Sequence, residues 1–250
     1  MKKYNALVVA EIGTFIINRN DTGVGWQLSE YGTYDPQELY VIREILKILK
    51  IASPNLVVLD IGANIGVHSV VFSREVGGGV VYAFEPQRII FNMLAGNIAI
   101  NSLSNVYCFH NAVTDISGLI DIPIFDYGKP LSFGSIEFEG AQKEDIGQKP
   151  ISGEGEKVIG VVVDEMNFQQ VDFIKIDVEG MEIKVLRGAE KTILNFRPHM
   201  LLEYAKSDKT ELIGWLNRMR YKIYSGIGAN YLCVPEESNI FFDDLHLVNL

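Results

Sequence analysis

Residues 56–66 read LVVLDIGANIG, an apolar run that ends in Asp60 and continues into a glycine-containing turn. A short apolar run bounded by turn residues is typical of a strand that is buried on both faces. The helical pattern of residues 67–75 and a second apolar run, VVYAFE at residues 80–85, come next. Buried strands that alternate with helices predict a parallel sheet of the α/β class.

The same alternation continues along most of the chain. Near the C-terminus, two β-rich runs joined by the glycine-containing residues 226–230 predict a hairpin. The sequence therefore predicts a doubly wound, mostly parallel sheet with a C-terminal antiparallel hairpin. The other predicted elements are helices at residues 88–99, 182–195 and 208–219, and strands at residues 106–110, 171–177, 199–204, 221–225 and 231–234.

Two segments depart from this alternation. Residues 1–50 have β character early and a helix that begins at Asp35 and Pro36, which predicts an N-terminal β and helical extension packed on the core. We expect the main domain to span residues 51–250. Within it, residues 114–163 predict an insertion: a hairpin near 115–124, a long polar surface loop near 126–157 and a strand at 158–163.

Composition narrows the class of protein. The 250 residues contain 22 Lys and Arg against 32 Asp and Glu, so the net charge is 22 − 32 = −10. This acidic balance argues against a nucleic-acid partner and against binding to an anionic membrane. No apolar run approaches the roughly 18 residues that span a bilayer, and Cys108 and Cys233 form no metal-binding or disulfide pattern. We interpret the chain as a soluble, cytoplasmic protein.

The turn after the first strand has the properties of a ligand-binding loop. Gly62 permits a close backbone approach, Asn64 tolerates left-handed backbone angles, and Gly66 lets the next helix pack on the sheet. The free N–H groups of that helix, whose first turn contains His68, can face a ligand. An ordinary strand-to-helix turn would have similar residues, so this motif alone is a weak signal.

Glu85 strengthens the case for a nucleoside ligand. It ends the second strand, 19 residues after Gly66, where nucleotide-binding α/β folds place an acid that accepts hydrogen bonds from ribose hydroxyls. The loop lacks the full G-x-G-x-x-G pattern of dinucleotide sites. It does retain Asp60, an acid that suits a sulfonium and an amino group better than a pyrophosphate. S-adenosylmethionine carries both groups.

At these residues the chain resembles class I S-adenosylmethionine-dependent methyltransferases, and more narrowly the FkbM family. The resemblance extends over residues 31–235. The glycine loop is common to many methyltransferases, whereas the later run KIDVEGME is far more specific. The matching stretches are VLDIGANIG at residues 58–66, VYAFEP at 81–86, IKIDVEGME at 174–182, LRGA at 186–189 and the upstream YGTYDPQE at 31–38.

The resemblance implies a Rossmann-like fold with S-adenosylmethionine above the first strands. Glu85 would hold the ribose hydroxyls, Asn111 and Ala112 would lie near the adenine, and Asp177 and Glu179 would face the transferred methyl group. The residues expected to contact the cofactor are Asp60, Gly62, Ala63, Asn64, Gly66, His68, Glu85, Pro86, Asn111, Ala112 and Asp177. Family members mostly methylate hydroxyl oxygens of sugars and other small natural products.

The chemistry of methyl transfer gives Asp177 and Glu179 a separate argument. Both follow a predicted strand, at the edge where open α/β sheets bind ligands. An alcohol needs a base within hydrogen-bond reach, or a metal such as Mg²⁺, before it attacks a sulfonium carbon. The two acids can serve as base, cofactor ligand or metal ligands, although nothing in the pattern indicates a metal. Alternatively, they cap the following helix and pair with Lys175 or Lys184.

Further candidates concern the methyl acceptor. Glu203 ends the next strand and is a third candidate for catalysis. Within the insertion, Ser132, Ser135 and Glu137 have side chains suited to a polar substrate. We expect a small-molecule acceptor and predict no oligomeric state. A nicotinamide-dependent oxidoreductase and a non-catalytic binding module on the same fold are the alternative hypotheses.

Overall fold

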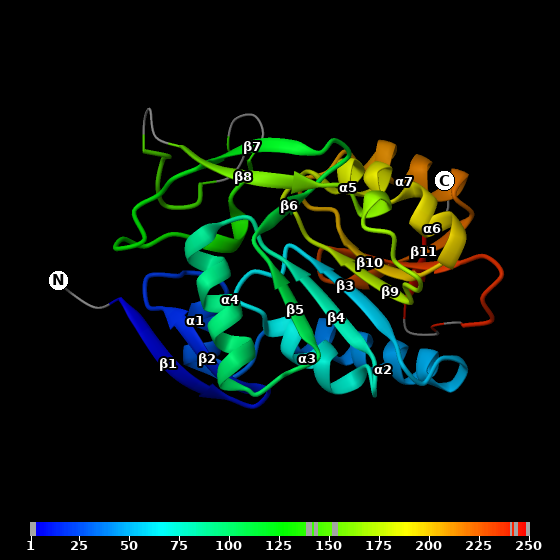
Figure 1. Ribbon diagram of the computed structural model, residues 1–250, viewed down its shortest axis with the longest axis horizontal. Helices are drawn as coiled ribbons and strands as arrows, with labels where there is room; N and C mark the ends of the chain where they lie inside the picture. Colours follow the sequence, from blue (N-terminus) through cyan, green and yellow to red (C-terminus); the bar gives the residue numbers. More distant parts are fainter. Residues whose placement is uncertain are drawn as a thin grey trace.

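The computed structural model describes residues 4–138, 142, 145–151, 155–240, 242 and 245–248. Its centre is an eight-stranded sheet with the order β13-β11-β12-β10-β9-β3-β4-β5 (Figure 1). The strands from β10 to β5 run parallel, as the apolar runs predict. These parallel strands are β3 (Val57–Ile61), β4 (Val80–Phe84), β5 (Val106–Phe109), β9 (Phe173–Ile176) and β10 (His199–Glu203).

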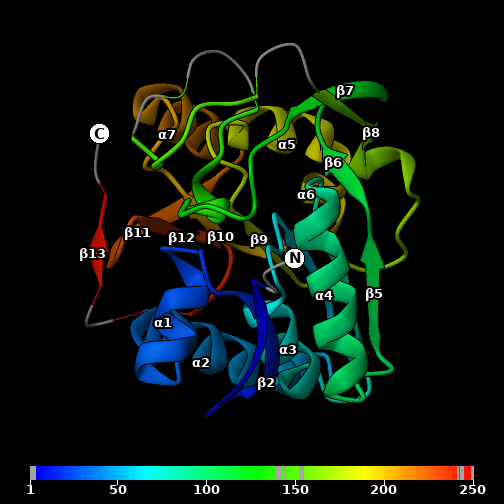
Figure 2. The ribbon, with the colours of Figure 1, turned by 90° about the vertical axis from the view of Figure 1, so that its left-hand side faces the viewer.

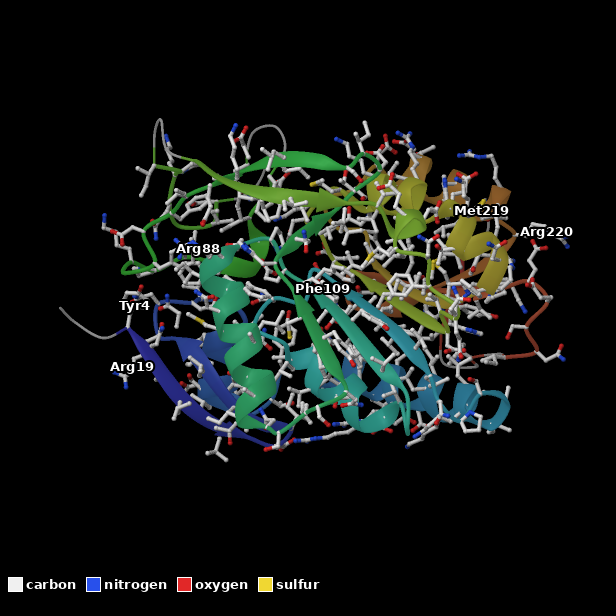
Figure 3. The ribbon with its side chains drawn as sticks, viewed as in Figure 1. Tyr4, Arg19, Arg88, Phe109, Met219 and Arg220 are labelled. Atoms are coloured by element: carbon white, nitrogen blue, oxygen red, sulfur yellow. The ribbon has the colours of Figure 1, made fainter. Side chains whose placement is uncertain are left out.

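Helices cover both faces of the sheet, because its central strands are apolar on both sides. One core cluster joins one face to α2, α3 and α4, and a second joins the opposite face to α5, α6 and α7. Side chains fill the space between these layers (Figure 3). The helices are α2 (Pro36–Ala52), α3 (Val67–Glu75), α4 (Arg88–Ile100), α5 (Glu182–Gly188), α6 (Glu190–Phe196) and α7 (Lys209–Arg218). Of the helices in the described residues, none has the length and apolar character needed to span a bilayer.

The C-terminal hairpin forms as predicted. Its second strand, β12 (Asn230–Pro235), lies between β10 and the first strand, β11 (Tyr221–Ile227), and is antiparallel to both. A short strand that the sequence did not predict, β13 (His246–Leu247), pairs with β11. The mostly parallel α/β sheet with an antiparallel end is therefore confirmed.

The first fifty residues cover the sheet on the α2 side. Strands β1 (Asn5–Ala10) and β2 (Gly13–Asn18) form a separate hairpin, and β2 packs on α4. A helix that the sequence did not predict, α1 (Val24–Tyr31), follows. Figure 2 shows this hairpin and α1 beside α2, α3 and α4. Helix α2 begins as predicted, with the Asp35 carboxylate accepting a hydrogen bond from the Glu38 N–H.

Two predictions within the insertion are wrong. No hairpin forms within residues 115–124. Instead, β7 (Gly118–Pro123) pairs with the distant β8 (Gly155–Val161), which also pairs with β6 (Asn111–Val113) in a three-stranded sheet. The loop between β7 and β8 is not wholly at the surface, because Phe133 and Ile136 are buried against the core. Arg88, labelled in Figure 3, ties this sheet to α4 through an ion pair with Glu156.

The single helix predicted over residues 182–195 is two helices. The break falls at Ala189, where α5 ends and α6 begins. Gly188 lies so close to the segment after β6 that a Cβ there would be 2.2 Å from the carbonyl oxygen of Thr114. Asp164 then caps the first turn of α6 by accepting hydrogen bonds from the N–H groups of Lys191 and Thr192. These tertiary contacts divide a segment whose apolar period is continuous.

Candidate active site

The carboxyl ends of β3, β4 and β9 enclose two adjoining hollows. The Glu85 hollow is lined by Glu85, Pro86 and Gln87 on one side and by Gly134 and Ile136 of the insertion on the other. The His68 hollow lies on the other side of the glycine loop. Both hollows share Gly62, Asn64 and Asp177. The two hollows therefore adjoin at the glycine loop and at the residue that follows β9.

The glycine loop brings two strand ends together. Gly62 has a φ of +82°, and a Cβ on it would lie 1.8 Å from the carbonyl oxygen of Asp177. Only glycine permits this contact between the loops after β3 and β9. Asn64 adopts a left-handed φ of +52°, as its residue type allows. The neighbouring Ala63 lines the His68 hollow, and Gly66 begins α3 with a φ of +90°.

Glu85 is a buried carboxylate that is held by backbone donors. Its Oε2 accepts a hydrogen bond from the Asn64 N–H at 3.0 Å, and its Oε1 accepts one from the Gln87 N–H at 2.8 Å. The side chain is only 4% exposed, and burial raises the pKa of Glu85 to about 8. Each oxygen retains a lone pair, so a carboxylate fixed in this way can accept two adjacent hydroxyls.

Asp60 lies beneath the loop and outside the lining of the hollows. It is fully buried, and its Oδ2 accepts a 2.5 Å hydrogen bond from the hydroxyl of Ser69 on α3. Its Oδ1 has no hydrogen-bond partner among the described residues. Burial raises the pKa of Asp60, while the nearby Lys175 and His68 oppose this effect. The predicted contact between Asp60 and the cofactor therefore stays a prediction.

His68 faces the hollow from α3 and is held from behind by α2. Its Nε2 lies 3.0 Å from Oε1 of the buried Glu38. Oε2 of Glu38 accepts a hydrogen bond from the side-chain amide of Asn230 at 3.3 Å. Burial alone would raise the pKa of Glu38, but His68 and then Lys175 outweigh this effect and lower it to about 2. The ring is thus fixed beside an ionised carboxylate.

Lys175 is a buried cation at the centre of the site. It is 1% exposed on β9, and its Nζ donates a 2.8 Å hydrogen bond to Oδ2 of Asp177. Although burial lowers the pKa of Lys175, the carboxylates of Asp177, Glu38 and Asp60 raise it overall, so the ammonium stays charged. Of the two alternative pairings considered for Asp177, the one with Lys175 forms.

Three acids gather where β9 and β10 end. One carboxylate oxygen each from Asp177, Glu179 and Glu203 lies within 4.8 Å of the other two, and we call these residues the acid cluster. Burial, followed by the charge of Asp177, raises the pKa of Glu179 to about 8 and that of Glu203 to about 9. Carboxylates so arranged are ligands that Mg²⁺ accepts. A cation is already present, because Lys206 Nζ lies 2.7 Å from Oε2 of Glu179.

The helix-capping alternative for these acids is not what the structure shows. Glu182, rather than Asp177 or Glu179, accepts hydrogen bonds from the N–H groups of Val178 and Gly180. Glu179 itself has a left-handed φ of +56°, which is uncommon for a residue with a side chain. The loop thereby places Asp177 and Glu179 in the lining of the Glu85 hollow and leaves Glu182 to accept its backbone N–H groups.

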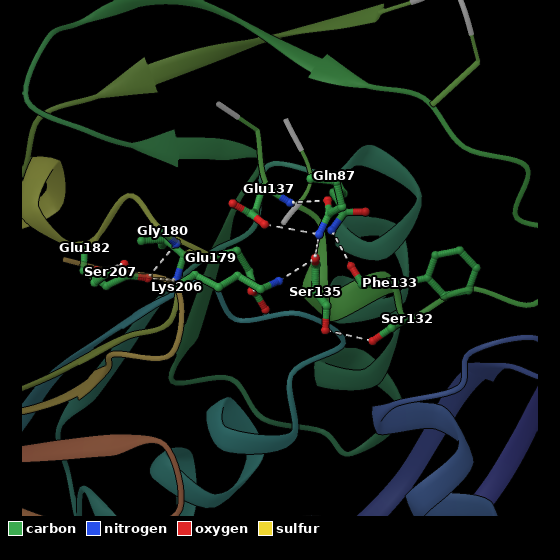
Figure 4. A network of polar contacts seen from close by, with 12 residues as sticks. Gln87, Ser132, Phe133, Ser135, Glu137, Glu179, Gly180, Glu182, Lys206 and Ser207 are labelled. Carbon is green, nitrogen blue, oxygen red and sulfur yellow. Dashed lines mark hydrogen bonds and ion pairs between the residues drawn. The ribbon is translucent and has the colours of Figure 1, made fainter. Parts of the chain in front are cut away.

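The insertion contributes a strap, residues 132–138, that covers the Glu85 hollow. Two long side chains hold its backbone: Gln87 Nε2 donates to the Phe133 carbonyl at 2.9 Å, and Lys206 Nζ donates to the Ser135 carbonyl at 2.7 Å (Figure 4). The predicted substrate residues Ser132 and Ser135 hydrogen-bond to each other at 2.9 Å. Glu137 is buried and accepts a hydrogen bond from Gln142. None of these three side chains lines the hollows, so their substrate role stays a prediction.

Asn111 and Ala112 also lie outside the lining of the hollows. They belong to β6, where the Asn111 side chain donates to the carbonyl of Ile159 and Ala112 is buried within the small sheet. Pro86, by contrast, lines the Glu85 hollow. The proximity of Asn111 and Ala112 to adenine stays a prediction.

Sequence reasoning assigned no role to several residues that build the site. Tyr34 and Val24 of the N-terminal segment line the His68 hollow, and Glu38, Gln87 and Lys206 hold other site elements. Tyr34 and Glu38 do lie in the stretch YGTYDPQE, which carried the family resemblance. Lys206 and Gln87 lie in no recognised motif, and their roles depend on contacts between distant segments.

Comparison with known proteins agrees with the site. The methyltransferase FkbM domain family matches residues 60–223. The methyltransferase sdnD of Sordaria araneosa is 26% identical over 159 residues, which cover 55% of this chain and 61% of that protein. The hexuronic acid methyltransferase AglP of Haloferax volcanii is 29% identical over 164 residues, which cover 61% and 60%. The matches thus span about three fifths of each relative.

A solved structure is also similar. The methyltransferase FkbM of Methylobacillus flagellatus matches with a TM-score of 0.48 and 18% identity over 72% of this chain and 42% of that one. Because the family match covers more than half of the chain and includes the glycine loop, Glu85 and the acid cluster, the resemblance found in the sequence is confirmed. This chain belongs to the FkbM methyltransferase family.

Proposed function

We propose that this protein is an S-adenosylmethionine-dependent methyltransferase that methylates a hydroxyl group of a small molecule, such as a sugar or another natural product. The observation that carries the proposal is the continuity of the site: the Glu85 hollow extends from a buried, hydrogen-bonded carboxylate to Asp177 and Glu179. A nucleoside held at one end thereby has its reactive end beside the acid cluster. The relatives, named as a methyltransferase and a hexuronic acid methyltransferase, support this class of acceptor.

The residues present fit this cofactor. Glu85 can accept both ribose hydroxyls, since each of its two oxygens is fixed by one backbone N–H and retains a lone pair. Gly62 and Asn64 leave the loop backbone open beside the ribose and sulfur positions. When bound, S-adenosylmethionine supplies a methyl group activated by a positive sulfonium. The carboxylate of Asp177, which lines both hollows, suits that charge.

The acid cluster provides the base. Oε2 of Glu203 is buried without a hydrogen-bond partner among the described residues, beside Asp177 and Glu179, which line the Glu85 hollow, while Glu203 itself lies outside that lining. A general base works best when its pKa lies near the working pH, and burial raises the pKa of Glu179 to about 8 and that of Glu203 to about 9. In this proposal Glu203 takes the proton of the attacking hydroxyl. Lys206 holds Glu179 and the strap in place around it.

Calorimetric titration with S-adenosylhomocysteine tests the cofactor. We expect micromolar binding and no binding of NAD. Glu85→Gln places an amide NH₂ against one of the two backbone N–H donors. The affinity of this variant for S-adenosylhomocysteine should therefore fall at least about tenfold, as for a lost hydrogen bond to a charged group. Glu165→Gln, a change of the same kind on the 3₁₀ turn Val163–Glu165, is the control.

The outcomes separate the hypotheses. Binding of NAD in place of S-adenosylhomocysteine would indicate an oxidoreductase and contradict the proposal. A non-catalytic module would be favoured if the protein binds S-adenosylhomocysteine but transfers no labelled methyl group from S-adenosylmethionine to any member of a broad panel of hydroxylated compounds. Equal affinities of the Glu85→Gln and wild-type proteins would remove the ribose role of Glu85.

A further inference from the structure

The His68 hollow lies where the third part of the proposed cofactor must go. A ligand whose ribose contacts Glu85 and whose sulfur lies near Asp177 has already used the Glu85 hollow. The two hollows meet at Gly62, Asn64 and Asp177, so the path beyond the sulfur leads past the glycine loop. The remaining part of S-adenosylmethionine is its α-amino acid end, which carries an ammonium and a carboxylate.

The polar groups of this hollow match both charges. Lys175 and the first turn of α3, which contains Val67 and His68, offer a cation and free backbone N–H groups to a carboxylate. Asp177 offers a carboxylate to an ammonium, and its side chain retains 32% of its exposure. A zwitterion therefore finds a complementary partner for each of its ends.

The N-terminal extension forms the outer wall of the hollow. Val24 begins α1, and Tyr34 lies in the loop between α1 and α2. The rings of Tyr34 and His68 meet edge to face, with centroids 5.9 Å apart. The hydrogen bonds among the described residues include none to the Tyr34 hydroxyl. A phenol that lines a hollow of charged groups without such a bond has a donor to offer a ligand.

His68 is oriented for the same purpose. Oε1 of Glu38, in the first turn of α2, lies 3.0 Å from Nε2, so this edge of the ring faces α2. Nδ1 is the ring nitrogen that Glu38 does not engage. Asn230 from the distant β12 supports Glu38 in turn. The extension thus contributes both a direct contact and the residue that positions His68.

We propose that the N-terminal extension is a working part of the cofactor site, in which Tyr34 and the Glu38-held His68 bind the α-amino acid end of S-adenosylmethionine. This inference rests on the proposed function and goes beyond it, since it assigns cofactor recognition to Tyr34 and Glu38, which precede the matched residues 60–223. Tyr34 is the direct contact, and Glu38 is a positioning residue.

Two probes that differ only in the amino acid end test this inference. S-adenosylhomocysteine has that end, whereas 5′-methylthioadenosine lacks it but keeps the adenosine and the sulfur. We expect Tyr34→Phe to weaken the binding of S-adenosylhomocysteine about tenfold, as for a lost hydrogen bond to a charged group. The affinity for 5′-methylthioadenosine should change less than about twofold. Tyr31→Phe, an exposed tyrosine of the same extension, should change neither affinity.

Glu38→Gln should reproduce in part the selective loss of affinity for S-adenosylhomocysteine, because a glutamine side chain still contacts His68 but no longer carries a charge.

Thermal unfolding of each variant shows whether it is folded before titration. An equal loss for both probes, or no loss for S-adenosylhomocysteine, would overturn the inference while leaving the proposed function intact. Absence of S-adenosylhomocysteine binding to the wild type would instead overturn the proposed function, and the inference with it. If 5′-methylthioadenosine binds the wild type too weakly to measure, the affinities of Tyr34→Phe and Tyr31→Phe for S-adenosylhomocysteine are compared. A loss for Tyr34→Phe alone supports the inference, and equal affinities overturn it.

Discussion

Two groups of buried charged residues flank Asp177, and they differ in the ratio of acids to bases. On one side, the fixed-charge group, which comprises Glu38, Asp60, His68 and Lys175, pairs acids with bases. On the other, the acid cluster sets Glu179 and Glu203 beside Asp177, with Lys206 as a cation on Glu179. The pKa of Glu38 is lowered to about 2, whereas those of Glu179 and Glu203 are raised to about 8 and 9.

This difference separates two tasks. Glu38 and Lys175 keep their charges across the physiological range, because the pKa of the acid is lowered and that of the base is raised, and so they give the site a constant field. The crowded Glu179 and Glu203 titrate at higher pH, at about 8 and 9, and can exchange protons with an acceptor there. Lys175 on β9 belongs to the first group, and Asp177 and Glu179 just after β9 belong to the second, so one strand end serves both.

Removal of the buried cation should produce the largest effect. Lys175→Met leaves the carboxylates of Asp177, Glu38 and Asp60 without their common partner. We expect the free energy of unfolding to fall by about 3–5 kcal/mol, as for a broken buried ion pair. Urea denaturation measures this loss, and the exposed Lys47→Met should leave the midpoint of denaturation nearly unchanged. A similar small loss for both variants would show that the fixed-charge group is not structural.

The acid cluster should appear in the pH dependence of stability. A carboxyl group whose pKa is raised on folding stabilises the native state most below its unfolded pKa, near 4.5, and that contribution is lost as the pH rises through the folded value, about 9 for Glu203. Between pH 6 and 8, unfolding free energy should therefore decrease with pH. Glu203→Gln should reduce this decrease by up to about 1.4 kcal/mol per pH unit. An unchanged slope would contradict the raised pKa of Glu203.

The smallest effect concerns support for Asp60. Ser69→Ala removes the hydrogen bond to Oδ2 of a carboxylate whose other oxygen already lacks a partner. We expect a loss of about 1–3 kcal/mol in unfolding free energy. Ser117→Ala, which removes an exposed hydroxyl bond to Glu165, should cost less than about 0.5 kcal/mol. If the two variants lose equally little, the Asp60 carboxylate must be satisfied in another way.

The sequence was most informative where a local pattern and a global contact agree. The parallel strands, the glycine loop and the hairpin follow from apolar runs and turn residues, and the structure contains them. The pairing of β7 with β8 could not be foreseen, because strand pairing across more than thirty residues leaves no local pattern. The same reason explains the break at Ala189, which depends on the close approach of Gly188 to Thr114.

The site shows the same division. Glu85 and the acid cluster stand at strand ends, where their position along the chain already indicates a shared edge. Lys206 and Gln87 act through side chains that reach the insertion, so their roles appear only once the strap is placed. Burial also decides the pKa values, and burial depends on the whole fold rather than on the neighbouring residues.

The hydrogen bond between Asn230 and Glu38 joins residues 192 positions apart. During synthesis, Glu38 therefore lacks this partner until Asn230, 192 residues later, has been made. Strand β12, to which Asn230 belongs, must insert between β10 and β11 at that late stage. Long-range pairing of this kind is slow to form. A nascent chain on the ribosome would thus have its glycine loop early and complete the surroundings of His68 only after β12 emerges.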